Sequence, residues 1–286
     1  MQFSDLLGLL TTPWGLALLG LCVGSFLNVV IHRMPQMLER QWRADSAAML
    51  ELPHKPDEAP LTLSKPASRC PACGHAIRWH ENIPLISWLV LRGKCSSCGV
   101  SISVRYPVIE LLTAALFAAC GWRFGTQPVV LLWCVFVAVI VAASAIDWDT
   151  TLLPDDLTLP LLWIGLIAAA LGWTTLPLRD ALWGAVAGYL SLWSVYWLFK
   201  LTTGKEGMGY GDFKLLAALG AWLGWSMVLP VVLASSVIGA VVGIAMKLNS
   251  SLREGHYVPY GPFLGGAGLA VMLSGPQRVL EWLGWT

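Results

Sequence analysis

The sequence predicts an all-α polytopic membrane protein with one small polar domain outside the bilayer. Hydrophobic residues make up 56% of the 286 residues and charged residues only 12%, about half the charged share of an ordinary globular protein. The 16 tryptophans fit the same class, because Trp favours the bilayer interface. The net charge of +1 excludes a nucleic-acid-binding protein that works by bulk electrostatics.

Apolar runs of about 20 residues, the length that crosses the hydrocarbon core as a helix, recur along the chain. They predict about eight transmembrane helices, at residues 12–31, 106–122, 128–146, 157–173, 181–200, 212–227, 228–247 and 260–274. The first run lacks a basic leader and a small-residue cleavage site, so we expect an uncleaved span. The predicted divisions are 1–31, the first transmembrane helix; 32–105, the polar domain; and 106–286, a membrane domain with the remaining helices.

Lys and Arg gather on one side of the predicted spans. Residues 32–105 hold ten of the 18 basic residues. Five more fall on the same side: Lys200, Lys205, Lys214, Lys247 and Arg253. The opposite side receives only Arg123, Arg179 and Arg278. By the positive-inside rule the polar domain is cytoplasmic, and both termini lie on the outer side of the membrane.

Two Cys-x-x-Cys pairs stand in the polar domain, at Cys70 and Cys73 and at Cys95 and Cys98. Their separation is close to the four-cysteine zinc pattern, and each pair can aim two thiolates at one tetrahedral ion. Four cysteine ligands leave no open position, so the predicted Zn²⁺ is structural. Two disulfides or four free thiols are the alternatives, and a reducing cytosol disfavours the disulfides.

Other candidate ligands in the sequence are weaker. His75 and His80 follow the first pair and could replace a cysteine as ligands. The remaining cysteines lie in apolar spans, where a thiol is usually a small buried hydrophobe: Cys22, Cys120 and Cys134.

Acidic residues at the predicted membrane edge are candidates for function, because charge there is costly. They are Glu110, Asp147, Asp149, Asp155, Asp156 and Asp212. The topology puts Asp147 and Asp212 on the same side but on different helices. Two carboxylates brought together share a proton, and such a pair can activate water and polarise a carbonyl, which is aspartic-protease chemistry.

Simpler interpretations of these acids remain open. Asp155 and Asp156 follow Pro154 and could cap a helix, as could Asp212. Asp149 could be an interfacial charge, and Glu110 could pair with Arg105 or Lys94. On these residues alone, an aspartyl dyad competes with the site of an ion-coupled transporter.

In this order along the chain, the motifs resemble the type IV prepilin leader peptidases, a family of bifunctional peptidases and N-methyltransferases. The resemblance runs nearly end to end. It rests on residues 24–35, both Cys-x-x-Cys pairs, Glu81-Asn82-Ile83-Pro84, Arg105-Tyr106-Pro107 with Glu110, Asp147 followed by Leu153-Pro154-Asp155, and Gly209-Tyr210-Gly211-Asp212-Phe213-Lys214. The Gly-x-Gly-Asp element is also similar to that of presenilin-type intramembrane aspartyl proteases.

The resemblance implies an enzyme of the bacterial inner membrane that cuts prepilin and pseudopilin leaders after a glycine at the cytoplasmic face. Type IV pili and type II secretion use such substrates. It implies that the enzyme then N-methylates the new terminal residue, usually Phe, with S-adenosylmethionine. It puts the catalytic aspartates at Asp147 and Asp212 and makes 106–286 the peptidase domain.

The methyl-donor site is much harder to predict. No Gly-rich loop follows a strand, so a Rossmann-type cofactor fold is unsupported. The resemblance points to the domain at 32–105, around Gly93, Lys94 and Glu81. Gly93 could equally be a plain turn before Cys95.

Two rival functions would use parts of the same sequence. An ion-coupled membrane transporter would use Asp147 and Asp212 as a proton relay, but it would often show inverted repeats, and no clear repeat is present. A membrane-anchored zinc adaptor would need only residues 70–98 and would leave the Gly-x-Gly-Asp element unexplained. Prepilins, pseudopilins and membrane lipids are the expected partners, without nucleic acid.

Overall fold

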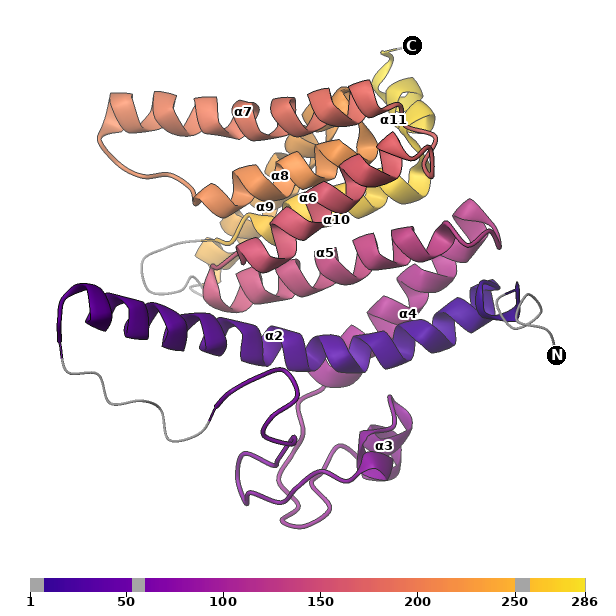
Figure 1. Ribbon diagram of the computed structural model, residues 1–286, viewed down its shortest axis with the longest axis vertical. Coiled ribbons are helices and arrows are strands. Elements are labelled where there is room, and N and C mark those ends of the chain that lie inside the picture. The colour runs from indigo at the N-terminus through magenta and orange to yellow at the C-terminus, as the bar shows by residue number, and fades with distance from the viewer. Residues whose placement is uncertain (1–7, 53–59, 250–257, 286) are drawn as a thin grey trace. The chain divides into compact units, whose positions relative to one another are not determined.

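The computed structural model describes residues 8–52, 60–249 and 258–285, and in these ranges every regular element is a helix (Figure 1). Isolated bridges join Arg69 to Ala76 and Lys94 to Ser101. The predicted all-α class is therefore confirmed. The chain forms two compact units, Met1–Ala138 and Val139–Thr286. The predicted domain boundaries at residues 31 and 105 stay predictions.

Several of the described helices are long and apolar enough to cross a membrane, which confirms the membrane class. They are α2 (Pro13–Met49), α4 (Arg105–Phe124), α5 (Val130–Thr150), α7 (Leu178–Thr203) and the segment Trp225–Leu248, which joins η2 (Trp225–Met227) to α9 (Val228–Leu248).

Three other predicted spans are shorter helices than expected. They are α6 (Asp155–Ala170, 16 residues), α8 (Tyr210–Leu223, 14 residues) and α10 (Gly261–Ser274, 14 residues). A helix of 14 residues rises about 21 Å, which is less than the ~30 Å of hydrocarbon in a bilayer. The count of about eight spans therefore stays a prediction. The last described helix is α11 (Pro276–Leu283).

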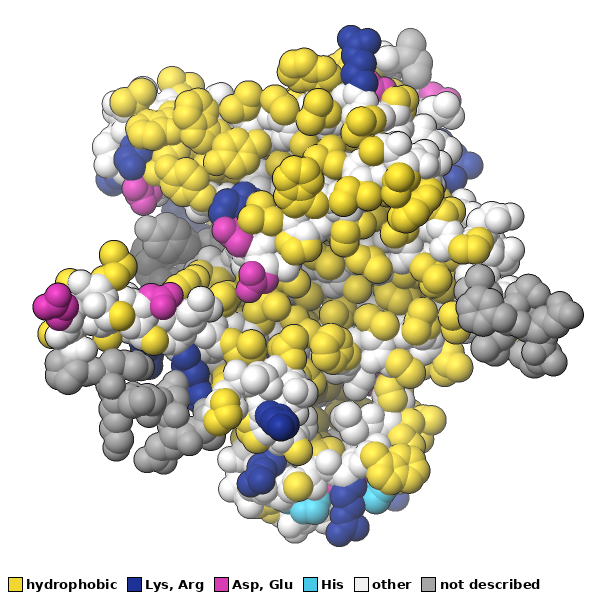
Figure 2. All heavy atoms as spheres, viewed as in Figure 1, with side chains coloured by type: hydrophobic (Ala, Val, Ile, Leu, Met, Phe, Trp, Pro, Cys, Tyr) yellow, Lys and Arg dark blue, Asp and Glu magenta, His cyan; other side chains and the backbone are white. Residues whose placement is uncertain are grey.

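The outer faces of the long helices are apolar. Figure 2 shows hydrophobic side chains over most of the helical surface in view, with Lys, Arg, Asp and Glu scattered among them. On α7, for example, Leu182, Trp183, Leu190, Val195 and Leu198 are exposed. A surface of this kind suits contact with lipid rather than with water.

In the first unit, α2 and α4 pack closely through two glycines of α2. A Cβ on Gly20 would lie 2.7 Å from Cα of Ala114, and one on Gly24 would lie 2.7 Å from Cα of Glu110. Small residues at such a crossing let two backbones approach, as is common between membrane helices. The contact holds Glu110 against α2.

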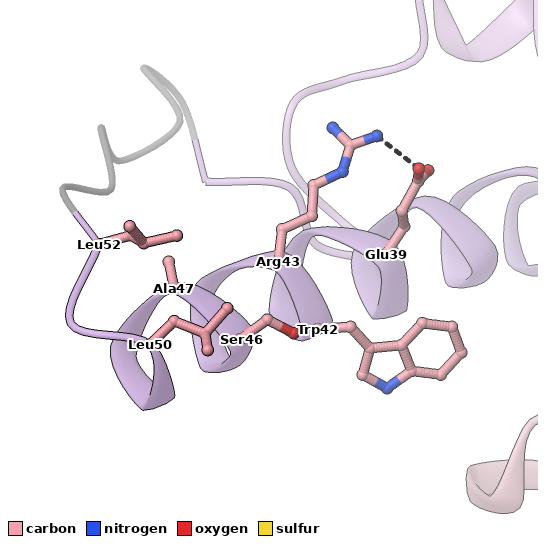
Figure 3. A pocket seen from close by; sticks show the side chains of 7 residues that line it. All are labelled: Glu39, Trp42, Arg43, Ser46, Ala47, Leu50 and Leu52. Atoms are coloured by element: carbon pink, nitrogen blue, oxygen red, sulfur yellow. Dashed lines mark hydrogen bonds and ion pairs between the residues drawn. The ribbon is translucent and has the colours of Figure 1, made fainter.

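The helix α2 continues well beyond the predicted first span, through residues 36–49. Its continuation is polar and contains an i,i+4 ion pair between Glu39 and Arg43, a pairing that supports exposed helices. Near its end Glu39, Trp42 and Arg43 help to line a surface hollow, and Figure 3 shows the ion pair directed away from the Trp42 ring. The hollow contains no cysteine and no buried acid.

In the second unit, α8 is the central helix. It packs against α6, α7 and α10, and all of its residues from Asp212 to Leu223 except Lys214 are buried. Gly184 of α7 meets Gly220 of α8 backbone to backbone. The indole N–H of Trp222 donates to the Leu161 carbonyl of α6 at 2.8 Å. These contacts hold the last turn of α8 in the unit, and Asp212 lies at the other end of the same helix, in its first turn.

Candidate functional site

The structure brings together two buried acids in the second unit. Asp147 lies near the end of α5 and is 5% exposed, and Asp212 lies in the first turn of α8 and is 7% exposed. The two carboxylates are close enough for their charges to interact. Charged groups are almost never this buried unless they have a partner or a function.

Asp147 is oriented by the backbone of another helix. Its Oδ2 accepts a hydrogen bond of 2.8 Å from the N–H of Gly261, the first residue of α10. A Cβ on Gly261 would lie 2.6 Å from this oxygen, so the contact requires glycine. Sequence reasoning missed Gly261, although the run Pro259-Tyr260-Gly261-Pro262 signals a tight helix start.

Asp212 has an oxygen that the described residues leave unsatisfied. Its Oδ1 is buried and has no hydrogen-bond partner among them. A buried polar atom without a partner is costly, and such atoms gather at sites where a reacting group binds. This oxygen is therefore free to exchange a hydrogen bond or a proton with a bound molecule.

The Gly-x-Gly-Asp element has a packing role in the structure. A Cβ on Gly211 would lie 2.6 Å from Cβ of Leu153, in the loop that precedes α6. A Cβ on Gly209 would have Gly211 N, 4.0 Å away, as its nearest neighbour. At Gly211, then, the missing side chain lets the start of α8 approach Leu153.

These two glycines provide a matched test. Gly211→Ala should destabilise the protein by about 1–3 kcal/mol, because it overpacks the contact with Leu153. Gly209→Ala should cost less than about 1 kcal/mol, since its Cβ meets open space and Ala is only a poorer N-cap. Thermal unfolding of the two variants in the same detergent measures the difference, and equal losses would contradict the packing role.

The other acids of the second unit lie on its surface. Asp149, Asp155 and Asp156 are all exposed. Both oxygens of Asp155 lie 2.7 Å from Nζ of Lys214, and Asp155 and Asp156 are in the first turn of α6. Asp155 and Asp156 thus suit the helix dipole, but the N-cap is Pro154 and no side-chain cap hydrogen bond is present. The interfacial role of Asp149 stays a prediction.

Glu110 is buried in the first unit, 7% exposed, and holds a loop. Its Oε2 accepts the N–H of Leu85 at 2.8 Å. Leu85 has a φ of +58°, a conformation that is unfavourable for a branched side chain. Glu110 therefore stabilises the loop that leads into α3 (Ile86–Val90).

The four cysteines converge as predicted. Their Sγ atoms all lie within 4.8 Å of one another, and those of Cys70 and Cys98 are 3.8 Å apart. Sulfur atoms around a tetrahedral zinc, with Zn–S bonds of about 2.3 Å, are separated by about 3.8 Å. The cluster therefore fits Zn²⁺. All four cysteines are free in the structure, without a disulfide.

The two cysteine loops have the same backbone pattern. In the first, Gly74 N–H donates to Cys70 O at 2.9 Å, and in the second, Gly99 N–H donates to Cys95 O at 3.0 Å. The φ angles of Gly74 and Gly99 are +72° and +71°, which favours glycine at both positions. Each loop thus turns two thiols towards the same point.

Backbone N–H groups inside the loops also favour the thiolate form. Those of Cys73 and Ala72 lower the pKa of Cys70 to about 7, and a thiolate is the form that binds metal. His75 has another partner, since its Nε2 lies 3.2 Å from Oε2 of Glu81. The described cluster of possible ligands contains neither His75 nor His80.

The three residues predicted for the methyl donor all have contacts within their own domain, and Lys94 has its bridge to Ser101. Oε2 of Glu81 accepts the Arg78 N–H at 2.8 Å, which, with Ser96 and His75, lowers the pKa of Glu81 to about 2. Gly93 is buried with a φ of +66°, and a Cβ there would lie 2.9 Å from the Trp88 ring. Lys94 is exposed. Nothing in these contacts favours Glu81 or Gly93 as direct ligands of the donor, and all three residues remain predictions.

Comparisons with known proteins cover both units. Residues 18–124 match the bacterial peptidase A24 N-terminal domain, and residues 134–244 match the type IV leader peptidase family. The chain is 54% identical to a prepilin leader peptidase/N-methyltransferase of Stutzerimonas stutzeri, over 93% of this chain and 91% of the relative. Proteins with the same name in Pseudomonas aeruginosa and Aeromonas salmonicida are 53% and 52% identical, with the same coverage. No solved structure is significantly similar to this chain.

Proposed function

The chain belongs to the type IV leader peptidase family, and on this premise we propose that Asp147 and Asp212 are its catalytic pair. The enzyme cleaves the leader from prepilins and N-methylates the residue that cleavage exposes. One observation supports the catalytic assignment most directly: two buried carboxylates, from different helices of one unit, include an oxygen of Asp212 that has no partner among the described residues. Pseudopilins of type II secretion are the second proposed substrate class.

The chemistry follows from a pair of carboxylates that share one proton. The ionised carboxylate takes a proton from water, and the resulting hydroxide adds to the scissile carbonyl. The protonated carboxyl donates a hydrogen bond to that carbonyl oxygen and stabilises the negative charge that develops there. Collapse of the tetrahedral intermediate breaks the C–N bond, and the leaving amine takes up a proton.

The rival functions have no support in the comparisons. The relatives cover 93% of the chain and are named for peptidase and methyltransferase activities. Neither of these activities is that of a transporter. A zinc adaptor would leave the buried acids of the second unit without a role.

We infer that the four cysteines hold one structural Zn²⁺, because four thiols at these separations match its tetrahedral geometry. A domain with little core gains much of its folding free energy from such an ion. S-adenosylmethionine supplies the methyl group when bound. We propose that it binds in the region around Gly93, Lys94 and Glu81.

The proposed location is the bacterial inner membrane, with the cysteine loops and both aspartates on the cytoplasmic side. The argument for this orientation is the excess of Lys and Arg in residues 32–105. Accessibility of single introduced cysteines in spheroplasts tests it. If a cysteine introduced at residue 49 is labelled from the outer side, the proposed orientation is wrong.

The purified protein tests the function as a whole. In detergent or liposomes it is expected to shorten a prepilin and to transfer labelled methyl from S-adenosylmethionine to the shortened product. A product cut without label would remove the methyltransferase half of the proposal. Failure to cut any prepilin or pseudopilin would remove the peptidase half.

A further inference from the structure

The start of α10 directs a hydrogen-bond donor at Asp147. The first N–H groups of a helix have no partner within it. In α10, Pro262 has no N–H, and the N–H groups of Phe263 and Leu264 both donate to the Tyr260 carbonyl at 3.1 Å. The N–H of Gly261 donates instead to Oδ2 of Asp147 at 2.8 Å.

The position of Gly261 is itself held from α9. The hydroxyl of Tyr260 lies 2.7 Å from Oγ of Ser235 and 3.0 Å from Oγ of Ser236. Ser235 is fully buried. One turn further along α9, a Cβ on Gly239 would lie 3.1 Å from the Phe263 ring, so the two helices are in close contact there. The start of α10 is thereby anchored on both sides of Gly261.

We propose that Gly261 is a positioning residue for Asp147 and that Tyr260 anchors it. The N–H of Gly261 sets the direction of the Asp147 carboxylate, and the missing side chain leaves room for that carboxylate to approach. The proposal rests on the proposed function, because it assumes that Asp147 reacts. It deepens that function by assigning to α10 a part in the catalytic geometry, across 114 residues of sequence.

The decisive variants lie on one helix. Gly261→Ala puts a methyl group 2.6 Å from Oδ2 of Asp147, whereas Gly266→Ala, in the middle of α10, puts one where no atom lies within 4 Å. We expect kcat for leader cleavage to fall about 100-fold in Gly261→Ala, the cost of misplacing a catalytic group by about 1 Å. KM should stay within about twofold, because Gly261 contacts the carboxylate of Asp147 rather than the substrate. Gly266→Ala should match the wild type in both constants.

Methyl transfer to a pilin that has already been cut serves as the folding control. It should be unchanged in both alanine variants. A Gly261→Ala enzyme that cleaves within about threefold of the wild-type kcat would overturn the proposal, as would a rise in KM alone.

Tyr260→Phe provides a second, milder variant, which leaves the glycine at position 261 unchanged but removes the hydroxyl that anchors it. Loss of hydrogen bonds of ordinary strength should lower kcat about 3- to 10-fold, again with KM and methyl transfer unchanged. If Gly261→Ala fails to fold, this variant decides, and an unchanged kcat would refute the proposal. The aspartate pair is tested separately. If the Asp147→Asn enzyme still cleaves the leader, the proposed catalytic pair is refuted, whatever the result for the Gly261 variant.

Discussion

Replacing either Asp147 or Asp212 by Asn is expected to reduce leader cleavage about 1,000-fold or more. Asn has nearly the same size and fills the same buried space, but it can neither take a proton from water nor give one to an intermediate. Loss of a catalytic group that acts as part of a unit has effects of this size or larger. The measurement is the initial rate of prepilin cleavage in liposomes, with the amounts of folded enzyme matched.

Asp155→Asn is the matched control for both changes. It removes an exposed carboxylate of the same unit and its ion pair with Lys214, and an exposed ion pair contributes little to stability. Cleavage by this variant should stay within about threefold of the wild type. All three variants should still methylate a pilin that has already been cut.

One pattern of results would refute the dyad. If cleavage survives either Asp147→Asn or Asp212→Asn, the reacting carboxylates lie elsewhere. Asp149, Asp155 and Asp156 would then return as candidates in spite of their exposure.

Changing Cys95 to Ser is expected to weaken zinc binding and methyl transfer together. The serine hydroxyl is a much poorer zinc ligand than a thiolate, and with three sulfur ligands the tetrahedral site is incomplete. We expect zinc affinity to fall at least about 100-fold, because the structural ion and the folding of its loops depend on each other. Zinc content is measured by elemental analysis, and loop order by the rate of limited proteolysis at residues 68–101.

Cys22→Ser is the control for this change, since Cys22 is an exposed thiol of α2 outside the cluster. It should retain one zinc per chain. A strong chelator should reproduce the Cys95→Ser phenotype in the wild-type enzyme, and added Zn²⁺ should reverse it. Wild-type protein that methylates fully without zinc, or that loses activity to a thiol reductant alone, would contradict the zinc assignment and favour the free thiols or the disulfides.

The parts of the site that could be predicted from the sequence are those encoded within a few residues. Each Cys-x-x-Cys loop contains its own turn and its own glycine, so the convergence of four thiols needed only that the two loops meet. Asp147 and Asp212 stood out because an acid in an apolar run is conspicuous. The resemblance of the motifs around them to those of the family indicated that these two aspartates act as a pair.

The contacts that could not be predicted join an acidic side chain to a backbone N–H that is distant in the sequence. Gly261 donates through its main-chain N–H, a group that every residue except proline has, so its identity gave no sign of its partner. Glu110 likewise holds the N–H of Leu85, although the sequence suggested Arg105 or Lys94 as partners. Long-range contacts of this kind depend on how the helices pack and leave no local pattern.

The helix lengths show a similar division. Hydropathy located α5 and α7 well, because their apolar runs have clear polar ends. It stopped α2 at residue 31, where the apolar run ends, although good helix formers continue the helix to Met49. It also overestimated α8, whose helix ends at Leu223 because Gly224, with a φ of +89°, breaks it.

The enclosure of α8 limits how a polypeptide can reach Asp212. The helix is covered by α6, α7 and α10 along its length, so a helical substrate lying alongside it would have to displace one of them. The N-terminal end of α8 is less covered, since Tyr210 is exposed there, so a chain can approach this end of the helix. Backbone that enters in this way has left its own helix, and its carbonyls have lost their internal partners. Substrates then differ in how easily their backbone unwinds around the scissile bond, rather than in the apolar sequence that follows it.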